Sequence, residues 1–502
     1  EKFINHIVVT NSTSIVTGDY NTLLLLFEVQ FESGLAESYQ LPITFAKSKL
    51  AQKLGEYCPE SVIANITVGN SEGLLVDALY TADLQQVLIE KLAANDHIKL
   101  NQSTIEFRSN KALNSELEKQ KQVKSQIHTE DGFTSIWYDN GYILKMYRKV
   151  DPTTNPDVEI TQYLSDQANF PYVPAFSGAI EWKFERDTIS LGMLQVLVEN
   201  HGDGYSFMLT RINNFIERIL AGNKEELLKT PLLGSLTEPL GFEELSVELQ
   251  EFLGTTASEQ IRMIGVRTGE MHLALASGTN LKDFAPEDFS LHYQRSLFSS
   301  MQTTVRETFQ FSHSVLSELP DNIKSELEEI LSRKEEILIL LKRIYAKKLD
   351  VLKIRIHGNF HLGQVLLTGK DITITDFGGD PIRSFSDRRL KRSPLRDVAA
   401  MIRSIRYVAY DGFLETSHVQ KEEIKSILPF ARIWAHYISG FFMRAYIDTV
   451  KNNQFIPTNK EDLQMMLDTY MLEKSMHDLN AELKNKGDSV IIPLRSIKAI
   501  LD

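Results

Sequence analysis

The residues best suited to chemistry in this chain lie between positions 355 and 380. Asn359 and Gln364 are five residues apart, and Asp376 follows two apolar runs that are separated by the turn sequence Thr368–Asp371. This pattern predicts a β-hairpin that returns Asp376 to the side of Gln364. An amide oxygen and a carboxylate brought together in this way suit a Mg²⁺ ion that is bound to nucleotide phosphates. The segment therefore predicts a phosphoryl-transfer centre.

Asn359 occupies the position at which such a centre carries the group that orients the acceptor hydroxyl. Its amide oxygen accepts a hydrogen bond from a hydroxyl but cannot take up the proton, so Asn359 is unsuited to act as a general base. Positioning and charge neutralisation supply most of the acceleration in phosphoryl transfer. We therefore expect a weakened reaction together with an intact set of nucleotide and Mg²⁺ ligands.

The same residues resemble the catalytic loop of aminoglycoside phosphotransferases and protein kinases, in which His-Gly-Asp is followed after four residues by a metal-binding amide and later by Asp-Phe. More narrowly, three segments are similar to bacterial maltokinases, including maltokinase regions fused to trehalose synthase: His361–Gln364, Asp376–Pro381 and Arg388–Ala399. Two positions depart from the family pattern. Asn359 stands where the family carries the catalytic Asp, and Gly378 stands where it usually carries Glu.

This resemblance implies a function and two cofactors. A maltokinase uses ATP and Mg²⁺ to convert maltose to maltose 1-phosphate, in the metabolism of trehalose and α-glucan. Asn359 leaves a second interpretation open, in which the chain is a weakened or inactive kinase-like protein that binds a partner such as trehalose synthase, fused or separate. A kinase for another sugar or an aminosugar is the third interpretation.

The nucleotide-binding residues are expected upstream of this centre. The segment Tyr142–Tyr147 reads as an apolar strand that contains Lys145, and a lysine in such a place either extends to solvent or pairs with an anion. A helical pattern follows from about Asn155, and Glu159 on this helix can face Lys145. A strand lysine paired with a helix glutamate is the arrangement with which kinase-like folds hold the phosphates. The resemblance implies the same roles for Lys145 and Glu159.

Two further parts of a nucleotide site follow from the resemblance. Backbone groups near Gln195, Val196 and Leu197 are expected to form the inter-lobe hinge that meets the adenine edge. The segment Glu130–Ser135 stands where relatives have a phosphate-covering turn, and its Gly132 permits close approach of the backbone to phosphate. An ordinary hairpin loop is the alternative for this segment.

Aromatic residues beside carboxylates suit a carbohydrate, because the C–H faces of a sugar stack on rings while its hydroxyls form directional hydrogen bonds. Aromatic residues at helical spacing are more often core residues, so packing is the alternative. The candidate substrate-binding residues are His357, Arg396, Trp434, Tyr437 and Tyr470. His272, on the apolar face of a predicted helix, is expected to be structural.

The length and composition limit the possible folds and classes of protein. With 502 residues, 42% of them hydrophobic and 24% charged, the chain is globular and long enough for two or three domains. Strand patterns dominate the first 110 residues and helical patterns the last 300. We predict an α+β fold with a β-rich cap domain at 1–110, a kinase-like N-lobe at 111–200, and a largely helical C-lobe at 201–502 that carries the catalytic loop and the sugar-binding region.

Several classes of protein are disfavoured by the sequence. The net charge of −13 argues against a nucleic-acid-binding or membrane-surface protein. No apolar run approaches the roughly 20 residues of a membrane span, and the first residues lack the order of a signal peptide. The single cysteine, Cys58, excludes a disulfide within the chain and fits a cytoplasmic location. Because the sequence begins with Glu1 and not Met, we expect that a further segment precedes it in the natural chain.

Overall fold

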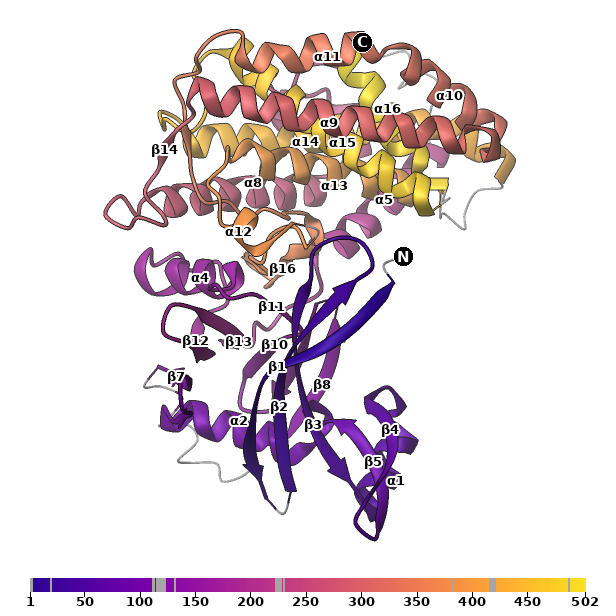
Figure 1. Ribbon diagram of the computed structural model, residues 1–502. Helices are drawn as coiled ribbons and strands as arrows, with labels where there is room; N and C mark the ends of the chain where they lie inside the picture. The colour runs from indigo at the N-terminus through magenta and orange to yellow at the C-terminus, as the bar shows by residue number, and fades with distance from the viewer. Residues whose placement is uncertain are drawn as a thin grey trace. The chain divides into compact units, whose positions relative to one another are not determined.

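The computed structural model describes residues 3–18, 20–110, 113, 123–130, 132–221, 228, 231–381, 383–414, 421–485 and 488–502. The chain divides into two compact units (Figure 1). The first consists of Glu1–Gln167, Val173–Val198 and Asp380–Arg388, and the second of Ala168–Tyr172, Glu199–Gly379 and Arg389–Asp502. Position 131, in the predicted phosphate-covering loop, lies outside the described residues.

The first unit begins with an antiparallel sheet in the order β1-β2-β3-β5-β4. Its strands are β1 (Ile4–Thr17), β2 (Tyr20–Phe31), β3 (Glu37–Ala46), β4 (Val62–Val68) and β5 (Ser71–Asp77). In β3, every second side chain from Gln40 to Ala46 is buried, which is the period-two pattern of a sheet with one covered face. The helices in this part are α1 (Ser48–Tyr57) and α2 (Ala82–Ala94).

The second sheet of this unit has seven strands in the order β6-β7-β12-β13-β10-β9-β8. Their bounds are β6 (His97–Lys99), β7 (Thr104–Ser109), β8 (Ser125–Glu130), β9 (Phe133–Tyr138), β10 (Tyr142–Tyr147), β12 (Phe176–Lys183) and β13 (Thr188–Val196). The strand β10 contains Lys145, as predicted. After β10 the chain continues directly into β11 (Lys149–Val150), which pairs with β3 of the first sheet. One continuous core of buried residues joins the inner faces of the two sheets.

The helix α4 (Pro156–Gln162) of the first unit begins at a capped turn. Asn155 is its N-cap, and the side-chain oxygen of Asn155 accepts a hydrogen bond of 2.9 Å from the backbone N–H of Asp157. Pro156 occupies the first helical position, where a missing N–H costs nothing. This local sequence explains why the helix starts where it does, with the buried Asp157 in its first turn.

The second unit is mainly helical. Its helices are α5 (Gly204–Ala221), α7 (Val247–Leu253), α8 (Thr255–Ala276), α9 (Leu291–Val315), α10 (Asp321–Ser332), α11 (Lys334–Lys342), α13 (Leu395–Leu414), α14 (Lys421–Val450), α15 (Lys460–Asn485) and α16 (Ile491–Leu501). In Figure 1, α13 lies beside α14 and α15, and α14 packs on α8. Two short sheets complete the unit, one of β14 (Glu287–Asp288) and β15 (Leu352–Lys353), the other of β16 (Val365–Leu367) and β17 (Ile372–Ile374).

The fold class agrees with the prediction, because a β-rich N-terminal part precedes a helical C-terminal part. The amphipathic stretch 322–346 forms two helices, α10 and α11, which meet at Arg333. The predicted boundary between 110 and 111 lies within the first unit, which continues to Gln167 before its first break. The division into three domains stays a prediction.

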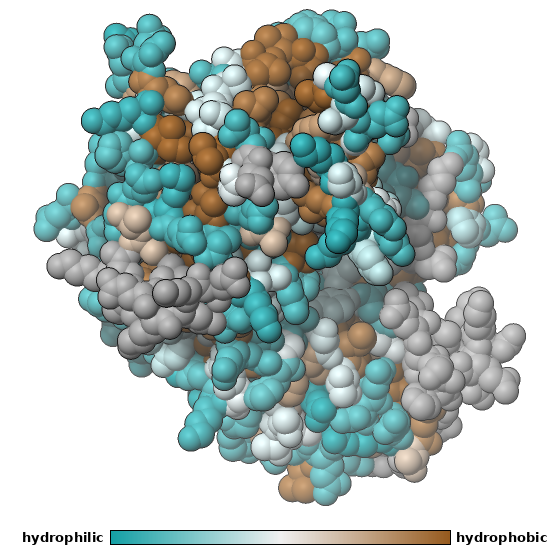
Figure 2. All heavy atoms as spheres, turned by 90° about the horizontal axis from the view of Figure 1, so that it is seen from below, coloured by the Kyte–Doolittle hydropathy of each residue, from teal (hydrophilic) through white to brown (hydrophobic). Residues whose placement is uncertain are grey.

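Hydrophobic residues are exposed in places among the hydrophilic residues of the face seen in Figure 2. In the sequence, the longest exposed apolar run lies on the edge strand β1, where Ile4, Ile7, Val8 and Val9 are each at least 43% exposed. No helix in the described part of the chain combines the length and the apolar character needed to cross a membrane.

Candidate active site

The predicted hairpin is confirmed within the second unit. Strands β16 and β17 pair antiparallel with Val365 opposite Ile374. The turn is closed by a hydrogen bond of 3.0 Å from the backbone N–H of Thr368 to the carbonyl oxygen of Asp371, and Gly369 in the turn has a φ of 88°. Both strands are short and bury most of their side chains, so the hairpin is anchored by apolar packing.

The hairpin brings the two predicted metal ligands together. The hydroxyl oxygen of Thr375 lies 3.4 Å from Oε1 of Gln364 and 3.4 Å from Oδ2 of Asp376. The backbone N–H of Thr375 also donates a 2.9 Å hydrogen bond to the carbonyl oxygen of Gln364. Asp376 has a φ of 63°, a left-handed conformation that costs a non-glycine residue roughly 1–3 kcal/mol and often marks a functional position.

These oxygens fit Mg²⁺ in their chemistry. Magnesium prefers hard oxygen ligands and is usually held by one or two carboxylates together with substrate phosphates. The structure has no group of three or more His, Cys, Asp or Glu side chains that could hold a metal among its described residues. A pair of oxygen ligands from Gln364 and Asp376 is the arrangement expected when the nucleotide supplies the other ligands.

A buried aspartate holds the catalytic loop in place. The carboxylate of Asp397, in the first turn of α13, accepts hydrogen bonds from the backbone N–H groups of His357 (2.8 Å) and Gly358 (2.9 Å). It also lies 3.1 Å from Nε2 of His272. Burial by itself raises the pKa of Asp397, but the hydrogen bond from His272 and the nearby His357 outweigh it and lower the pKa below the usual value.

His272 has the structural role that the sequence predicted. Its ring is fully buried, and its Nδ1 lies 3.0 Å from the hydroxyl of Tyr446 while its Nε2 faces Asp397. Sequence reasoning did not single out Asp397, although it lies in the segment Arg388–Ala399 that carried the family resemblance. An acidic residue in the first turn of a helix was the available signal.

Asn359 lies in the loop that Asp397 holds, and it is half-buried. Its backbone N–H is 3.4 Å from Nδ1 of His357, whose Nε2 lies 2.9 Å from the carbonyl oxygen of Thr375. A carbonyl oxygen only accepts, so Nε2 of His357 carries the proton and Nδ1 is an acceptor. The fully buried side chain of His357 therefore connects the catalytic loop with the end of β17 through hydrogen bonds. Within the described residues, the side-chain amide of Asn359 forms no hydrogen bond.

Two glycines allow the loop to approach the segment that follows β17. Gly358 has a φ of 83° and Gly379 a φ of 72°, both in the left-handed region that side chains rarely adopt. A Cβ atom at Gly358 would lie 3.3 Å from Cα of Gly379. Glycine at both positions thus permits the close packing of the loop that carries Asn359 against the segment that carries Asp376.

His361 and Gln364 are in contact at the end of the loop. Nε2 of Gln364 lies 3.2 Å from Nε2 of His361, and the backbone N–H of Gly363 donates a 3.2 Å hydrogen bond to Nδ1 of His361. Burial, and then the nearby His357, Arg403 and Lys474, lower the pKa of His361 to about 4. The imidazole is therefore neutral near pH 7.

Apart from His357, the candidate substrate-binding residues fall into two groups. Arg396 forms a 2.6 Å ion pair with Glu473, and its guanidinium lies 5.8 Å from the ring of Tyr470. Trp434 and Tyr437 lie apart from this group in α14, where both are buried and the hydroxyl of Tyr437 accepts from the backbone N–H of Leu233 at 3.4 Å. The structure thus assembles Arg396 with Tyr470. The side chains of Trp434, Tyr437 and Tyr470 are all at most 3% exposed, so burial favours packing for the three aromatic residues alike.

A pocket of about 430 Å³ opens beside the catalytic loop in the second unit. It is lined by residues of three elements, the start of α5, the loop and α13: Asp203, Tyr205, Ser206, His361, Gly363, Arg403, Ser404 and Tyr407. Arg403 is held by an ion pair with Asp478 and lies 4.2 Å over the ring of Tyr407. The walls offer hydrogen-bonding groups and aromatic rings without an aliphatic side chain, and the size falls in the range of small-molecule sites.

The lysine that the sequence predicts to bind nucleotide, Lys145, is buried in the first unit. Nζ of Lys145 lies 3.4 Å from Oδ2 of Asp157, which also accepts a 3.0 Å hydrogen bond from the hydroxyl of Tyr147. The same ammonium lies 4.9 Å from the ring of Phe133, at the start of β9. Sequence reasoning named Glu159 as the partner and missed Asp157, two residues earlier on α4. The pairing of Lys145 with Glu159 stays a prediction.

Two backbone N–H groups of the predicted hinge form hydrogen bonds within the first unit. The backbone N–H of Val196 donates to the carbonyl oxygen of Ala175 at 3.0 Å, and that of Leu197 donates to Gly141 at 2.8 Å. Gln195 is buried and pairs with Ile143 in the sheet. Because these two N–H groups already donate hydrogen bonds, the backbone carbonyl groups of the predicted hinge are more available to the adenine edge than the N–H groups are.

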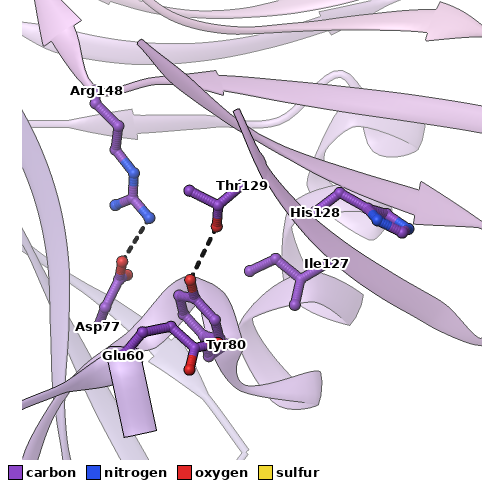
Figure 3. Close-up of a pocket in the computed structure, with 7 residues that line it drawn as sticks. All are labelled: Glu60, Asp77, Tyr80, Ile127, His128, Thr129 and Arg148. Atoms are coloured by element: carbon purple, nitrogen blue, oxygen red, sulfur yellow. Dashed lines mark hydrogen bonds and ion pairs between the residues drawn. The ribbon is translucent and has the colours of Figure 1, made fainter. Parts of the chain in front are cut away.

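Figure 3 shows a second pocket, of about 570 Å³, in the first unit. Arg148, the residue after β10, points across it to Asp77 at 2.5 Å, and its Nε donates a 2.9 Å hydrogen bond to Thr134. Tyr80 and Thr129 close another side with a 2.9 Å hydrogen bond between their hydroxyl groups. Arg148 thus links the strand that carries Lys145 to the N-terminal sheet.

Known proteins have a fold similar to that of this chain. No protein-family model matches the sequence. Three solved structures of glucosamine kinase are similar to the chain. The structure in complex with glucosamine, ADP and inorganic phosphate has a TM-score of 0.63 and 14% sequence identity, and the match covers 100% of this chain and 95% of that chain. The two other crystal forms have TM-scores of 0.61 and 0.62, with 14% and 13% identity, and each match covers 99% of this chain. Over its whole length, this chain has a fold similar to that of glucosamine kinase.

Proposed function

We propose that this chain is a phosphotransferase that moves the γ-phosphoryl group of ATP to a hydroxyl group of a sugar or an aminosugar. One observation carries the proposal: oxygens of Gln364 and Asp376 converge on the hydroxyl of Thr375 beside a catalytic loop that the buried Asp397 holds. Such a pair of ligands next to a rigid loop is what a metal-dependent phosphoryl transfer requires. The similarity in fold to glucosamine kinase supports the same reaction class.

The proposed roles follow from the chemistry of each residue. Gln364 and Asp376 hold Mg²⁺, which neutralises the charge on the phosphates when it is bound. Lys145, which lies beside Asp157 and in our proposal also beside Glu159, pairs with the nucleotide phosphates. Asn359 accepts a hydrogen bond from the acceptor hydroxyl through its amide oxygen and thereby orients that hydroxyl for attack. The backbone near Gln195–Leu197 contacts the adenine.

The acceptor that we propose first is maltose, phosphorylated at its anomeric hydroxyl to maltose 1-phosphate. The maltokinase-like segments His361–Gln364 and Arg388–Ala399 support this choice. Glucosamine is the second candidate, supported by the similarity in fold. Arg396 and Tyr470 are the proposed sugar-binding residues, because a guanidinium and an aromatic ring lie together there beside the loop. A single cysteine fits a reducing cytoplasm as the place of action.

The direct test is the detection of product. The chain is incubated with ATP, Mg²⁺ and either maltose or glucosamine, and the phosphorylated sugar is measured by mass spectrometry. Formation of maltose phosphate supports the first acceptor, and glucosamine phosphate the second. Absence of both products with the wild-type chain, and with the variant described next, contradicts the proposed function.

The base position has its own test. The substitution Asn359→Asp restores a carboxylate that can take the proton of the acceptor hydroxyl, and a general base contributes roughly 10²–10⁴-fold. We expect the turnover number to rise at least about tenfold, with little change in the KM for ATP. Asn359→Ala serves as the control, since it removes the hydrogen bond without adding a base. If Asn359→Asp is no faster than wild type, Asn359 does not occupy the base position.

Asn359 also favours a second candidate function, in which the chain binds nucleotide and a partner, such as trehalose synthase, without turnover. Calorimetric titration with ATP and Mg²⁺ separates this candidate from an enzyme. Nucleotide binding with no phosphorylated sugar from any of a panel of sugars favours the binding protein. Co-purification with trehalose synthase then identifies the partner.

A further inference from the structure

We infer that Gln40 is a positioning residue of the proposed nucleotide site: from β3 of the N-terminal sheet it fixes the end of β10, the strand that carries Lys145. The inference rests on the proposed function, because it assigns a role in the contact of Lys145 with the phosphates. The observation that carries it is a pair of hydrogen bonds. Nε2 of Gln40, a residue only 3% exposed, donates to the carbonyl oxygens of Tyr147 and Leu191.

The two carbonyl groups lie where the pairing of β10 with β13 ends. Met146 and Gly192 are the last residues in register, so Tyr147 and Leu191 are the next residues of the two strands. An amide NH₂ group carries two hydrogens, and one of them can go to each carbonyl oxygen. Gln40 therefore ties the two strands together at the end of their ladder.

The partners of the Gln40 side chain determine its orientation. A carbonyl oxygen only accepts, so the NH₂ group of the amide, and not Oε1, must face the two strands. Within the described residues, Oε1 of Gln40 has no hydrogen-bond partner. The backbone N–H of Gln40 adds a 3.0 Å hydrogen bond to the carbonyl oxygen of Arg148. An apolar side chain of the same length would thus fill the space of Gln40 and remove only the two bonds of its NH₂ group.

Tyr147 connects the end of β10 with Lys145. The two residues are two positions apart in the strand, so their side chains lie on the same face of the sheet. The hydroxyl of Tyr147 donates a 3.0 Å hydrogen bond to Oδ2 of Asp157, and Nζ of Lys145 lies 3.4 Å from the same oxygen. All three side chains are buried. A shift of the strand end therefore moves the hydroxyl that holds Asp157, and with it the carboxylate beside the ammonium group.

Such a shift should affect one part of a nucleotide and not the other. A charge-assisted hydrogen bond between an ammonium group and a phosphate oxygen needs a separation of about 2.7–2.9 Å, so displacement of Lys145 weakens it. The base, in the proposed site, contacts the backbone near Gln195–Leu197. Loss of the Gln40 bonds should therefore lower the affinity for the phosphates and leave the affinity for adenosine unchanged.

The test compares two buried glutamines of the first unit. Gln40→Met keeps the length of the side chain without its donors. Gln85→Met is the matched control, because Gln85 on α2 is 5% exposed and its Nε2 donates a 2.6 Å hydrogen bond to the carbonyl oxygen of Leu79, outside β10 and β13. Both variants lose buried hydrogen bonds, but only the first loses bonds to the strand of Lys145.

The measured quantity is the ratio of the Kd of adenosine to the Kd of a non-hydrolysable ATP analogue, both determined by calorimetry with Mg²⁺. A misplacement of about 1 Å can cost roughly 10²-fold in a positioned site. For Gln40→Met we expect the ratio to fall about tenfold, with a change in the Kd of adenosine below about twofold. Gln85→Met should keep the ratio of wild type.

Tyr147→Phe replaces Gln40→Met in the test if the latter fails to fold as judged by circular dichroism. It keeps the ring and removes the hydroxyl that holds Asp157, and we expect the ratio to fall about threefold or more. If wild type binds the analogue more tightly than adenosine and the variant tested keeps the ratio, the positioning role is wrong while the proposed function stands. An equal loss of affinity for both ligands likewise contradicts the role. If wild type binds the analogue no more tightly than adenosine, the proposed function is overturned together with this inference.

Discussion

The side chain of Asn359 has an oxygen that accepts a hydrogen bond and no group that takes up a proton at neutral pH. The loop that carries Asn359 is held by hydrogen bonds: His357 and Gly358 donate to Asp397, which is itself held by His272. Orientation of an acceptor and removal of its proton are thus separate properties at this site. The residues around Asn359 support orientation of the acceptor, whereas removal of its proton depends on the side chain at position 359 alone.

Asp397 gives a prediction of pH dependence at the residue scale. Its pKa in the folded chain is lowered, so its charged form stabilises the fold at pH values above the usual aspartate pKa of about 3.9. That stabilisation is lost as the pH falls below this value and through the lowered pKa. In Asp397→Asn, we expect the free energy of unfolding at pH 7 to fall by roughly 1–3 kcal/mol, because Asn cannot accept all of the same hydrogen bonds.

The measurement is urea unfolding at pH 7 and at several values down to pH 3. The wild type should lose stability more steeply below about pH 4 than Asp397→Asn does. Asp448→Asn is the control, since Asp448 forms an exposed i,i+4 pair with Arg444 and its side chain is 64% exposed. Equal acid slopes for wild type and Asp397→Asn would contradict the assigned role.

At the scale of elements, the hairpin β16–β17 is held at both ends. The catalytic loop adjoins its base, and the turn is held by α8 through Arg267, which makes two bonds of 2.9 and 2.6 Å to the carboxylate of Asp371. The guanidinium lies 3.8 Å over the ring of Tyr172 and also bonds Glu270 at 2.8 Å. A hairpin of three-residue strands is weak alone, so this anchor keeps its orientation.

Replacing Arg267 by Ala tests the anchor. We expect the free energy of unfolding to fall by about 1–3 kcal/mol, since a partly buried bidentate ion pair and its stacking are lost. The increase in nucleotide affinity that Mg²⁺ produces should become smaller as well, because the hairpin carries the proposed metal ligands.

Arg262→Ala on the same helix is the matched control. Arg262 pairs with Glu259 at the surface, and 57% of its side chain is exposed, so a change in the free energy of unfolding below about 0.5 kcal/mol is expected. Urea unfolding and calorimetry give both quantities, and equal losses for the two variants would contradict the anchoring role.

The first unit has its own connection between elements. After β10 the chain runs through Arg148 into β11, which pairs with β3 of the N-terminal sheet. The side chain of Gln40 on β3 donates to the carbonyl oxygen of Tyr147 at the end of β10 at 2.5 Å. The position of Lys145 is thus determined by both sheets. The N-terminal sheet thus supports the strand that carries Lys145 in the proposed nucleotide site.

At the scale of the whole molecule, the two units carry different parts of the proposed chemistry. The first unit contains Lys145 and the hinge, and the second contains the loop, the metal ligands and the sugar-binding candidates. A ligand that binds only the folded chain stabilises it by mass action, by about 2.7 kcal/mol at a concentration of one hundred times its Kd.

Thermal unfolding with ligands tests the molecule as a whole. Addition of ATP with Mg²⁺ should raise the Tm, and EDTA should abolish most of the rise, because the metal links the phosphates to Gln364 and Asp376. Lys145→Met, which keeps the length of the side chain without its charge, should reduce the rise. Lys183→Met, on β12 of the same sheet and paired with Glu106 at the surface, should not. A rise that is the same in EDTA would count against a metal-dependent nucleotide site.

The local parts of this protein could be predicted from the sequence. The hairpin, the convergence of Gln364 with Asp376, and the strand around Lys145 follow from turn residues and alternation over short distances, where few other conformations compete. The structural role of His272 followed from the same kind of pattern. These features need no knowledge of distant contacts.

The long-range partners became visible only in the folded chain. His272 and Asp397 are 125 residues apart, and no pattern in a single sequence pairs them. The same holds for the choice of Asp157 beside Lys145, and for Trp434, which helical spacing could not distinguish from a sugar-binding residue because core and site aromatics share the same period. Which side chain becomes buried, and which remains open to a ligand, depends on how distant elements pack, and that packing is the sum of many weak contacts that the local sequence does not encode.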